Sequence, residues 1–224
     1  MKRIILAICL FVSVALSAQE REFEFMPSST LRPSKTVFLY APDGPKALCE
    51  ISDPVYSENV ETLKLTRDEA PGFPEAEKMY AAGGQIRDIG DLARFDLYFP
   101  ENCCGEMVLV CPGGGYYCLA TYGEGLDCAE WLLQRGIAVA VAKTSLPNTH
   151  HKVPLAAIQM VMRYLRNHQV EWGIKKIGVM GVSAGGHLAA SASVLYVDRA
   201  TRPDFSVLFY PVITMDADVT HIGT

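Results

Sequence analysis

The stretch that decides the fold is KIGVMGVSAGGH, residues 176–187. Its first five residues predict a strand, and the small residues that follow Ser183 predict a helix. The pattern G-x-S-x-G lies at the turn between them, which is the context expected of a serine nucleophile. Because this turn is tight, Gly181 and Gly185 keep bulky side chains away, and Ser183 adopts a strained backbone position. We therefore predict that Ser183 is a nucleophile; the alternative is a Gly-Ser turn that only joins strand to helix.

Apolar runs and stretches of helical periodicity alternate on either side of this turn. Continuous apolar runs, typical of parallel strands buried on both faces, lie at residues 107–111, 137–142, 177–180 and 205–210. Stretches with helical spacing lie at residues 124–135, 153–172 and 184–197. Further strands are predicted upstream, at residues 36–40, 61–66 and 95–99. The repetition of strand and helix predicts an α/β fold with a parallel sheet and right-handed crossovers.

A second glycine-rich loop, CPGGGY at residues 111–116, also follows directly after a predicted strand. Its three glycines leave backbone N–H groups uncovered, and such groups can stabilise the oxyanion of an acyl-transfer transition state. The N–H of Ala184, directly after Ser183, would be the other donor. A flexible turn or a phosphate-binding loop is the alternative, although neither the dinucleotide pattern nor the Lys-Ser/Thr of an ATP-binding loop is matched.

Together the two loops resemble the α/β-hydrolase superfamily, and within it the exported acetylxylan-esterase-like and hormone-sensitive-lipase-like esterases. The resemblance runs from about Phe95 to the end of the sequence. Its further marks are Gly125, Leu146-Pro147, Pro154-Leu155 and the segments 129–132, 136–139, 171–174, 177–181 and 209–213. Pro112 stands where the family usually has His before its triple glycine, which fits the acetylxylan-esterase-like branch better.

This resemblance implies an α/β-hydrolase fold, a mostly parallel sheet with helices on both faces. It implies that Ser183 is the nucleophile and that Gly114, Gly115 and Ala184 supply the oxyanion-hole donors. The implied reaction is the hydrolysis of carboxylic esters through an acyl-enzyme on Ser183, in particular the deacetylation of carbohydrate. The alternatives are a serine peptidase of the same fold and an inactive truncated hydrolase with a binding role.

A serine nucleophile also needs a base and an acid that orients the base. In this superfamily the acid comes after the serine and the histidine comes last. By the resemblance, both follow strands that come after the one ending near Tyr210. We therefore expect the sequence to be truncated at its C-terminus and its last strands to be missing, either as a fragment of a longer product or as a natural truncation.

Other polar and aromatic residues are weaker candidates for the site. They are His187 and His221 for the base, Asp216 or Asp218 for the acid, His150 and His151 at the rim of the cleft, and Tyr116 and Tyr117 beside an acyl pocket. His187 lies in the first turn of a helix, where packing or capping is the simpler role. His168 lies late in a helix and is expected to be exposed to solvent.

The N-terminus has the pattern of a secretory signal. Basic residues 2–3 precede an apolar run at residues 4–14 and small residues at 15–18. The alternative is an uncleaved anchor helix, although the run is shorter than the ~20 residues that a membrane span needs. We expect a signal peptide at residues 1–18, a leader segment at 19–35 and one incomplete α/β-hydrolase domain at 36–224. The predicted location is exported, periplasmic or extracellular, with no stable membrane insertion once the signal is removed.

Composition excludes several classes of protein. Half of the 224 residues are hydrophobic and a fifth are charged, so extensive disorder is excluded. The formal net charge of −5, without a Lys/Arg cluster in the sequence, argues against a nucleic-acid partner and leaves a small-molecule or carbohydrate ester as the expected one. No two cysteines have C-x-x-C spacing, and no motif implies a metal or an organic cofactor. Pairing among the cysteines cannot be read from their spacing.

Overall fold

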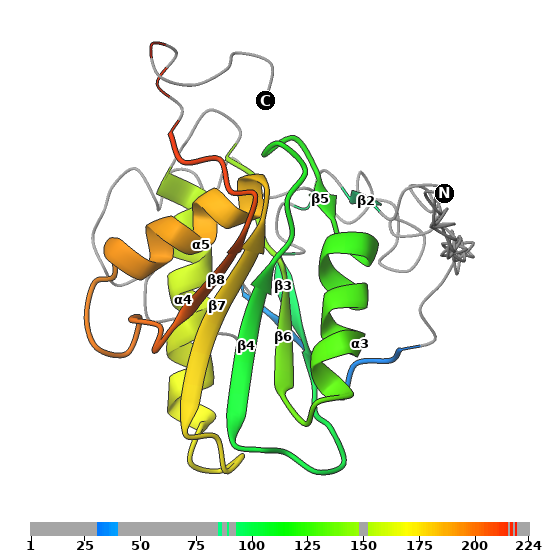
Figure 1. Ribbon diagram of the computed structural model, residues 1–224. Coiled ribbons are helices and arrows are strands. Elements are labelled where there is room, and N and C mark those ends of the chain that lie inside the picture. The colour runs from blue at the N-terminus through cyan, green and yellow to red at the C-terminus, as the bar shows by residue number, and fades with distance from the viewer. Residues whose placement is uncertain are drawn as a thin grey trace, which may run out of the picture.

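The computed structural model describes residues 31–39, 85–86, 89, 93–147, 152–214, 216 and 218. Their largest element is a six-stranded sheet with the strand order β1-β3-β6-β4-β7-β8 (Figure 1). Its strands are β1 (Lys35–Phe38), β3 (Arg94–Tyr98), β4 (Glu106–Cys111), β6 (Ala138–Lys143), β7 (Lys176–Val182) and β8 (Ser206–Phe209). A smaller sheet pairs β2 (Gln85–Ile86) with β5 (Leu119–Ala120).

The large sheet is mostly parallel. β6, β4, β7 and β8 run parallel, and Val110 on β4 lies opposite Val141 on β6 and Met180 on β7. At the other side, β1 pairs antiparallel with β3, and β3 pairs antiparallel with β6. Every strand predicted within the described residues is present, with its ends shifted by a residue or two. The strand expected at residues 61–66 lies outside the described residues.

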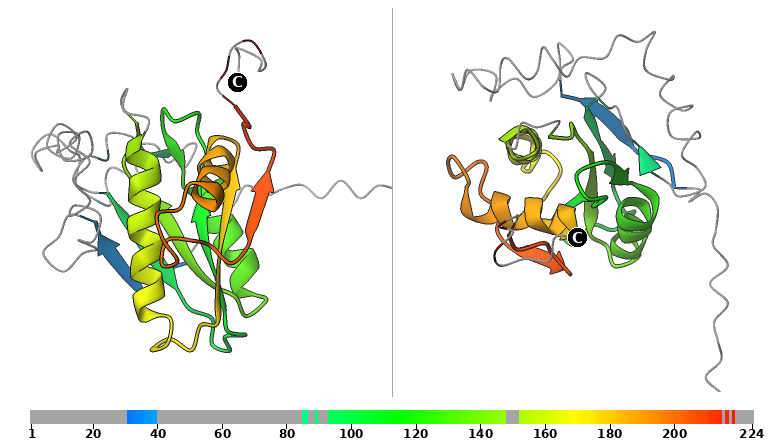
Figure 2. Two further views of the ribbon diagram at one scale, coloured as in Figure 1. Left: turned by 90° about the vertical axis from the view of Figure 1, so that its left-hand side faces the viewer. Right: turned by 90° about the horizontal axis from the view of Figure 1, so that it is seen from above.

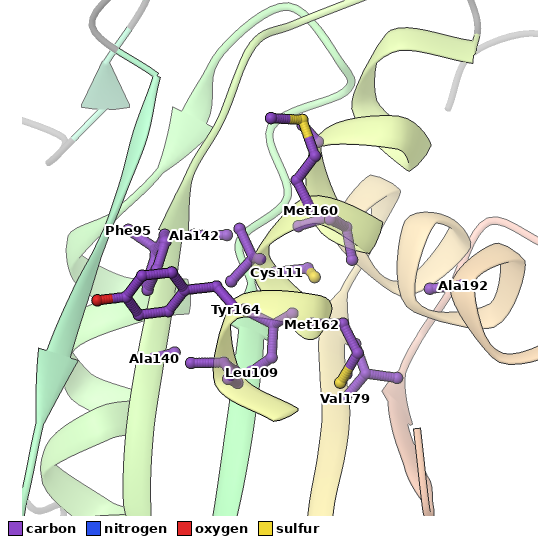
Figure 3. Packing of buried hydrophobic residues seen from close by; sticks show 14 of the residues in the cluster. Phe95, Leu109, Cys111, Ala140, Ala142, Met160, Met162, Tyr164, Val179 and Ala192 are labelled. Atoms are coloured by element: carbon purple, nitrogen blue, oxygen red, sulfur yellow. The ribbon is translucent and has the colours of Figure 1, made fainter. Parts of the chain in front are cut away.

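Helices cover both faces of the sheet, as expected (Figure 2). They are η2 (Tyr122–Leu126), a turn of π-helix, and α3 (Asp127–Leu133) on one face, and α4 (Lys152–His168) and α5 (Ala184–Val194) on the other. The larger part of the core lies beneath α4 and α5. Figure 3 shows Met160 and Met162 of α4 in the same cluster as Leu109 and Ala140 of the sheet, all of them almost completely buried. Burial of this apolar surface holds the helices on the sheet and fixes where the loops at its ends lie.

The expectation that residues 205–210 are buried on both faces is wrong. All four residues of β8 are exposed, and Phe209 retains 46% of its accessible surface. β8 has a hydrogen-bonded neighbour, β7, on one side, and among the described residues it is the edge of the sheet. The apolar run therefore forms the predicted strand, but its side chains are not covered by the described residues.

Several sequence predictions lie wholly or partly outside the described residues. They include the signal peptide at 1–18, most of the leader at 19–35, and His150, His151 and His221. Among the residues that the structure does describe, none of the helices combines the length and apolarity needed to cross a bilayer.

Candidate active site

Ser183 lies at the turn between β7 and α5, with backbone angles φ 54° and ψ −120°. Residues other than glycine rarely adopt this backbone conformation, so the turn holds Ser183 under strain. Its N–H donates to Phe209 O at 3.0 Å, and its carbonyl accepts hydrogen bonds from the N–H groups of His187 at 3.1 Å and Val212 at 3.2 Å. The predicted strand-turn-helix context of Ser183 is therefore present, and three backbone hydrogen bonds fix its position.

The glycines on either side of Ser183 leave no room for a side chain. A Cβ on Gly181 would lie 2.0 Å from the carbonyl oxygen of Gly185. A Cβ on Gly185 would lie 2.0 Å from the carbonyl oxygen of Cys111, at the end of the neighbouring strand β4. Both contacts are with backbone atoms, which cannot rotate away. The steric reason given for the G-x-S-x-G spacing is confirmed.

The second glycine-rich loop packs directly against this turn. A Cβ on Gly113 would lie 3.0 Å from Ser183 Cβ and 2.5 Å from Val182 O. Gly114 and Gly115 adopt φ values of 127° and 63°, which favour glycine. Among the described residues, their N–H groups have no hydrogen-bond partner, whereas Gly114 O accepts from the N–H groups of residues 117 and 118.

Glu124, on η2, is a residue of this site that sequence analysis missed. Its Oε2 accepts a hydrogen bond from Gly113 N–H at 2.7 Å. This bond occupies the first N–H of the glycine loop and leaves those of Gly114 and Gly115 for an oxyanion. The one available signal was an acidic residue at the start of the helix that follows the loop, and this signal is too common to identify a partner.

The first turn of α5 adds the N–H of Ala184 to the same region. The first N–H groups of an α-helix have no intrahelical partner and carry a partial positive charge. Ala184 is buried and follows Ser183 directly. The structure thus places the two glycine-rich segments next to each other at the carboxyl ends of β4 and β7, with Gly113 against Ser183 and Gly185 against Cys111 and Pro112. The roles predicted for Ser183, Gly114, Gly115 and Ala184 stay predictions.

His187 binds Tyr116, from the second glycine-rich loop. Its Nδ1 lies 2.8 Å from Tyr116 Oη, and the two rings meet edge to face at 5.8 Å. Burial lowers the pKa of His187, and burial together with the nearby Cys111 thiol raises that of Tyr116 well above its usual value. Neutral side chains are therefore favoured, and the Tyr116 hydroxyl can donate to Nδ1. The contact ties the glycine loop to α5, which agrees with a packing role for His187.

The expectation that His168 is exposed to solvent is wrong. Its ring stacks on Tyr164 at 4.1 Å and on Trp172 at 5.0 Å, and its Nδ1 lies 2.8 Å from Tyr164 O. The sequence prediction rested on the position of His168 near the end of a helix. It did not include Trp172, four residues later, which packs against the His168 ring. His168 and His187, the two histidines in the described part of the chain, thus both have partners other than Ser183.

The remaining described candidates are exposed or line little free space. Asp216 and Asp218 are exposed and hydrogen-bonded within their own turn. Tyr117 is 69% exposed. Tyr116 lines a cavity of ≈ 10 Å³ with Ala184 and Leu188, which is about the size needed for one water and too small for an acyl group.

The cysteines supply neither a disulfide nor a rival nucleophile in the described part of the chain. None of the five described cysteines forms a disulfide bond; they are Cys103, Cys104, Cys111, Cys118 and Cys128. Burial raises the pKa of the Cys111 thiol to about 12, so the reactive thiolate is disfavoured there. Across the same residues, no three His, Cys, Asp or Glu side chains are grouped to hold a metal ion.

Comparisons with known proteins agree with this geometry. Residues 114–222 match a protein family described as having the α/β hydrolase fold. An acetylxylan esterase from Xylanibacter ruminicola is 38% identical over 131 residues, which are 58% of this chain and 27% of that protein. The endo-1,4-β-xylanase B of Butyrivibrio fibrisolvens is 35% identical over 125 residues, which are 49% of this chain and 20% of that protein. The chain therefore spans no more than about a quarter of the length of these two curated relatives.

A solved structure supports the fold. The crystal structure of an acetyl ester-xyloside bifunctional hydrolase from Caldicellulosiruptor lactoaceticus matches with a TM-score of 0.53 and 22% sequence identity. The match covers 85% of this chain and 61% of that one. The resemblance and the fold class predicted from the sequence are confirmed.

Proposed function

Residues 114–222 match a family described as having the α/β hydrolase fold, and from this premise we propose that the protein is a serine carboxylic ester hydrolase that removes acetyl groups from carbohydrate. One observation carries the proposal. Ser183, strained at the end of β7, lies against Gly113 of a glycine loop in which the N–H groups of the next two glycines have no hydrogen-bond partner among the described residues. The names of the two curated relatives supply the substrate class.

In the proposed reaction, Ser183 Oγ attacks the carbonyl carbon of the ester and a base takes the hydroxyl proton. The N–H groups of Gly114, Gly115 and Ala184 stabilise the oxyanion that forms. Collapse of this intermediate breaks the bond to the alcohol oxygen, which leaves protonated as the sugar hydroxyl, and an acyl-enzyme remains on Ser183. Water then releases acetate and restores the serine.

Glu124 contributes to this arrangement by holding the glycine loop in place. Its carboxylate is an acceptor-only group, and the bond from Gly113 N–H is charge-assisted. The loop backbone is thereby held before any substrate arrives, and an oxyanion hole depends on such preorganisation. The rings of both described histidines bind groups other than the Ser183 hydroxyl, His187 the Tyr116 hydroxyl and His168 the Tyr164 carbonyl, so the general base is not assigned to either of them.

The test is acetate release from acetylated xylo-oligosaccharides, with Ser183→Ala as the matched variant. We expect activity in the unmodified protein and a loss of at least about 10³-fold in the variant. Short peptides assayed alongside separate an esterase from a peptidase. Equal inactivity of the two proteins on every substrate would contradict catalysis and favour a binding role.

We further propose that the protein is exported, on the strength of the basic, apolar and small segments at residues 1–18. Expression of the full sequence in a bacterial host, followed by fractionation and N-terminal sequencing, tests this. Export predicts a periplasmic or secreted product that begins near residue 18 or 19. A product that retains Met1 in the cytoplasm would overturn it.

A further inference from the structure

A basic hollow lies at the end of the sheet opposite to Ser183. It has a volume of ≈ 930 Å³ and is formed by the last turn of α4, the start of β7 and the segment between α5 and β8. Figure 2 shows that segment, in orange, looping out beside α4 before the chain enters β8. Because β7 rises about 3.3 Å per residue, the hollow lies roughly 20 Å from Ser183. It is therefore separate from the site described above.

Hydrogen bonds and ion pairs hold the frame of this hollow. Arg166 Nη1 donates to Asp204 Oδ2 at 2.8 Å, and Arg166 Nη2 donates to Arg202 O at 2.7 Å. Asp204 Oδ2 also accepts from Ile177 N–H at 2.7 Å, which fixes the chain just before β8 to β7. Desolvation opposes the charge on Asp204, but the bonds from Arg166 and Ile177 outweigh it and lower the pKa of its carboxyl. The Asp204 carboxylate thus already binds Arg166 and Ile177, which belong to the frame itself.

The loop that forms the outer wall is held in the same way. Asp198 Oδ1 accepts from the N–H groups of Ala200 and Thr201, and Thr201 Oγ1 accepts from those of Val197 and Asp198. Asp198 Oδ2 lies 2.7 Å from Arg163 Nη2, which connects the loop to α4. A wall ordered in this way needs little further ordering when a ligand binds.

Three cations on this frame have no carboxylate partner among the described residues. They are Lys175, Arg199 and Arg202, and all three are exposed side chains that line the hollow. With Arg166, the lining holds four cationic groups against one carboxylate, Asp204, in a chain whose formal net charge is −5. A local excess of three positive charges on an acidic protein favours an anionic ligand.

An aromatic ring lies beside these cations. Tyr196 lines the hollow, and the Arg202 guanidinium stands 5.3 Å from the centre of its ring. The tyrosine offers a flat apolar face together with a hydroxyl, a surface on which a sugar ring can pack. A guanidinium next to it matches the geometry of a carboxylate.

We propose that this hollow binds a carboxylate-bearing sugar unit of the polysaccharide on which the protein acts. That the ligand is a polysaccharide rests on the proposed function. That it carries a negative charge rests on the cationic lining of the hollow. The uronate carboxylate binds Arg199 and Arg202, Lys175 adds a third charge, and Tyr196 packs against the sugar ring. Binding here holds an acidic polymer on the protein at a second point, away from the site of ester hydrolysis.

The experiment is calorimetric titration of the Ser183→Ala protein with three probes. They are a xylo-oligosaccharide carrying one glucuronic acid, the same oligosaccharide without it, and sodium phosphate. We expect measurable binding of the acidic sugar, at least tenfold weaker binding of the neutral one, and weak binding of phosphate. Because Ser183 is absent, the result does not depend on catalysis, and a failed esterase assay leaves it interpretable.

Two variants locate the binding. Arg199→Glu combined with Arg202→Glu should weaken binding of the acidic sugar about tenfold or more, since two exposed charges are reversed. The matched control is Arg135→Glu, because Arg135 also lies over an aromatic ring, that of Trp131 at 3.6 Å, but just after α3 and outside the hollow. Arg135→Glu should leave the affinity unchanged.

Tyr196→Ala separates a sugar site from a simple anion site. This variant should bind the acidic sugar more weakly and bind phosphate with unchanged affinity. Phosphate binding as tight as that of the acidic sugar, equal binding of the neutral and acidic sugars, or no binding of any probe would each overturn the proposal. Equal losses in the Arg135 and Arg199/Arg202 variants would do so as well.

Discussion

β7 and β8 are neighbours in the same sheet, and both come from apolar runs, yet one is buried and the other is exposed. From Ile177 to Val182 every residue of β7 is buried, whereas all four residues of β8 are exposed. β7 pairs with β4 on one side and β8 on the other, and α5 packs against it. β8 pairs with β7 alone among the described residues.

This difference shows that an apolar run predicts a strand, while burial depends on what covers it. On the face of the sheet away from α5, an apolar groove of ≈ 740 Å³ extends over Met180 and Val182 of β7 and Val207 and Phe209 of β8. The carboxyl end of β7, where Ser183 lies, belongs to the covered part. We therefore expect the centre of the sheet to be intolerant of change and its β8 edge to be tolerant.

The largest effect is expected for Gly185→Ala. Its Cβ would lie 2.0 Å from Cys111 O and 2.6 Å from Pro112 O, so two backbone segments at the centre of the fold must separate. We expect a loss of more than about 3 kcal/mol in the free energy of unfolding, measured by urea denaturation. Esterase activity should disappear with it.

The control for this variant is Gly173→Ala. Gly173 has φ +68°, but no atom lies within 4 Å of its added Cβ. The backbone penalty alone should cost about 1 kcal/mol. Gly185 has no such backbone penalty, so a loss at Gly185 as small as that at Gly173 would show that the chain around the Ser183 turn moves aside and that crowding there is not decisive.

The second prediction compares two ion pairs. Asp96 on β3 and Lys143 on β6 lie 2.8 Å apart and are 3% and 4% exposed, whereas Arg163 and Asp198 at the surface are 20% and 44% exposed. Asp96→Asn removes the carboxylate that lies 2.8 Å from the buried Lys143 ammonium and should cost about 3 kcal/mol. Asp198→Asn should cost less than about 1 kcal/mol, because water screens the exposed pair. Thermal denaturation at neutral pH measures both, and similar losses would contradict the comparison.

The third prediction repeats one substitution in two strands. Leu109 on β4 is completely buried, and Leu208 on β8 is 38% exposed. Leu109→Ala should cost about 2–5 kcal/mol, because it removes buried methyl groups and leaves a cavity. Leu208→Ala should cost less than about 1 kcal/mol in the same urea titration. A large loss for Leu208→Ala would mean that β8 is covered in solution.

Sequence reasoning predicted the parts of this molecule that are set by local pattern. Central strands buried on both faces give continuous apolar runs, and the Ser183 turn needs glycines at fixed positions because its backbone contacts are so short. The bond between Glu124 and Gly113 and the exposure of β8 depend instead on how separate elements pack. The stacking of His168 on Tyr164 and Trp172 is local, four residues to either side, but helical periodicity alone does not show it. The Glu124 carboxylate accepts one hydrogen bond from Gly113, eleven residues earlier. A single contact of this kind produces no periodic pattern in the sequence. The candidate nucleophile and oxyanion donors could therefore be proposed from the sequence, whereas side-chain contacts such as that of Glu124 with the glycine loop could not.

The smallest predicted effect is a dependence of stability on pH through His187, which lies on α5 above the buried strand β7. Burial lowers the pKa of His187 below its ordinary value of 6.5. As the pH falls below about 6.5, the unfolded chain therefore binds a proton that the folded chain does not yet accept, and stability decreases with falling pH until the folded pKa is passed. His187→Asn should reduce this slope, measured as the free energy of unfolding between pH 5 and 7.5. Protonated Nδ1 also cannot accept the Tyr116 hydroxyl, so the contact that ties the glycine loop to α5 should weaken over the same range. An unchanged slope in the variant would mean that His187 is as well solvated as the residues of β8, and that the covered region ends before the first turn of α5.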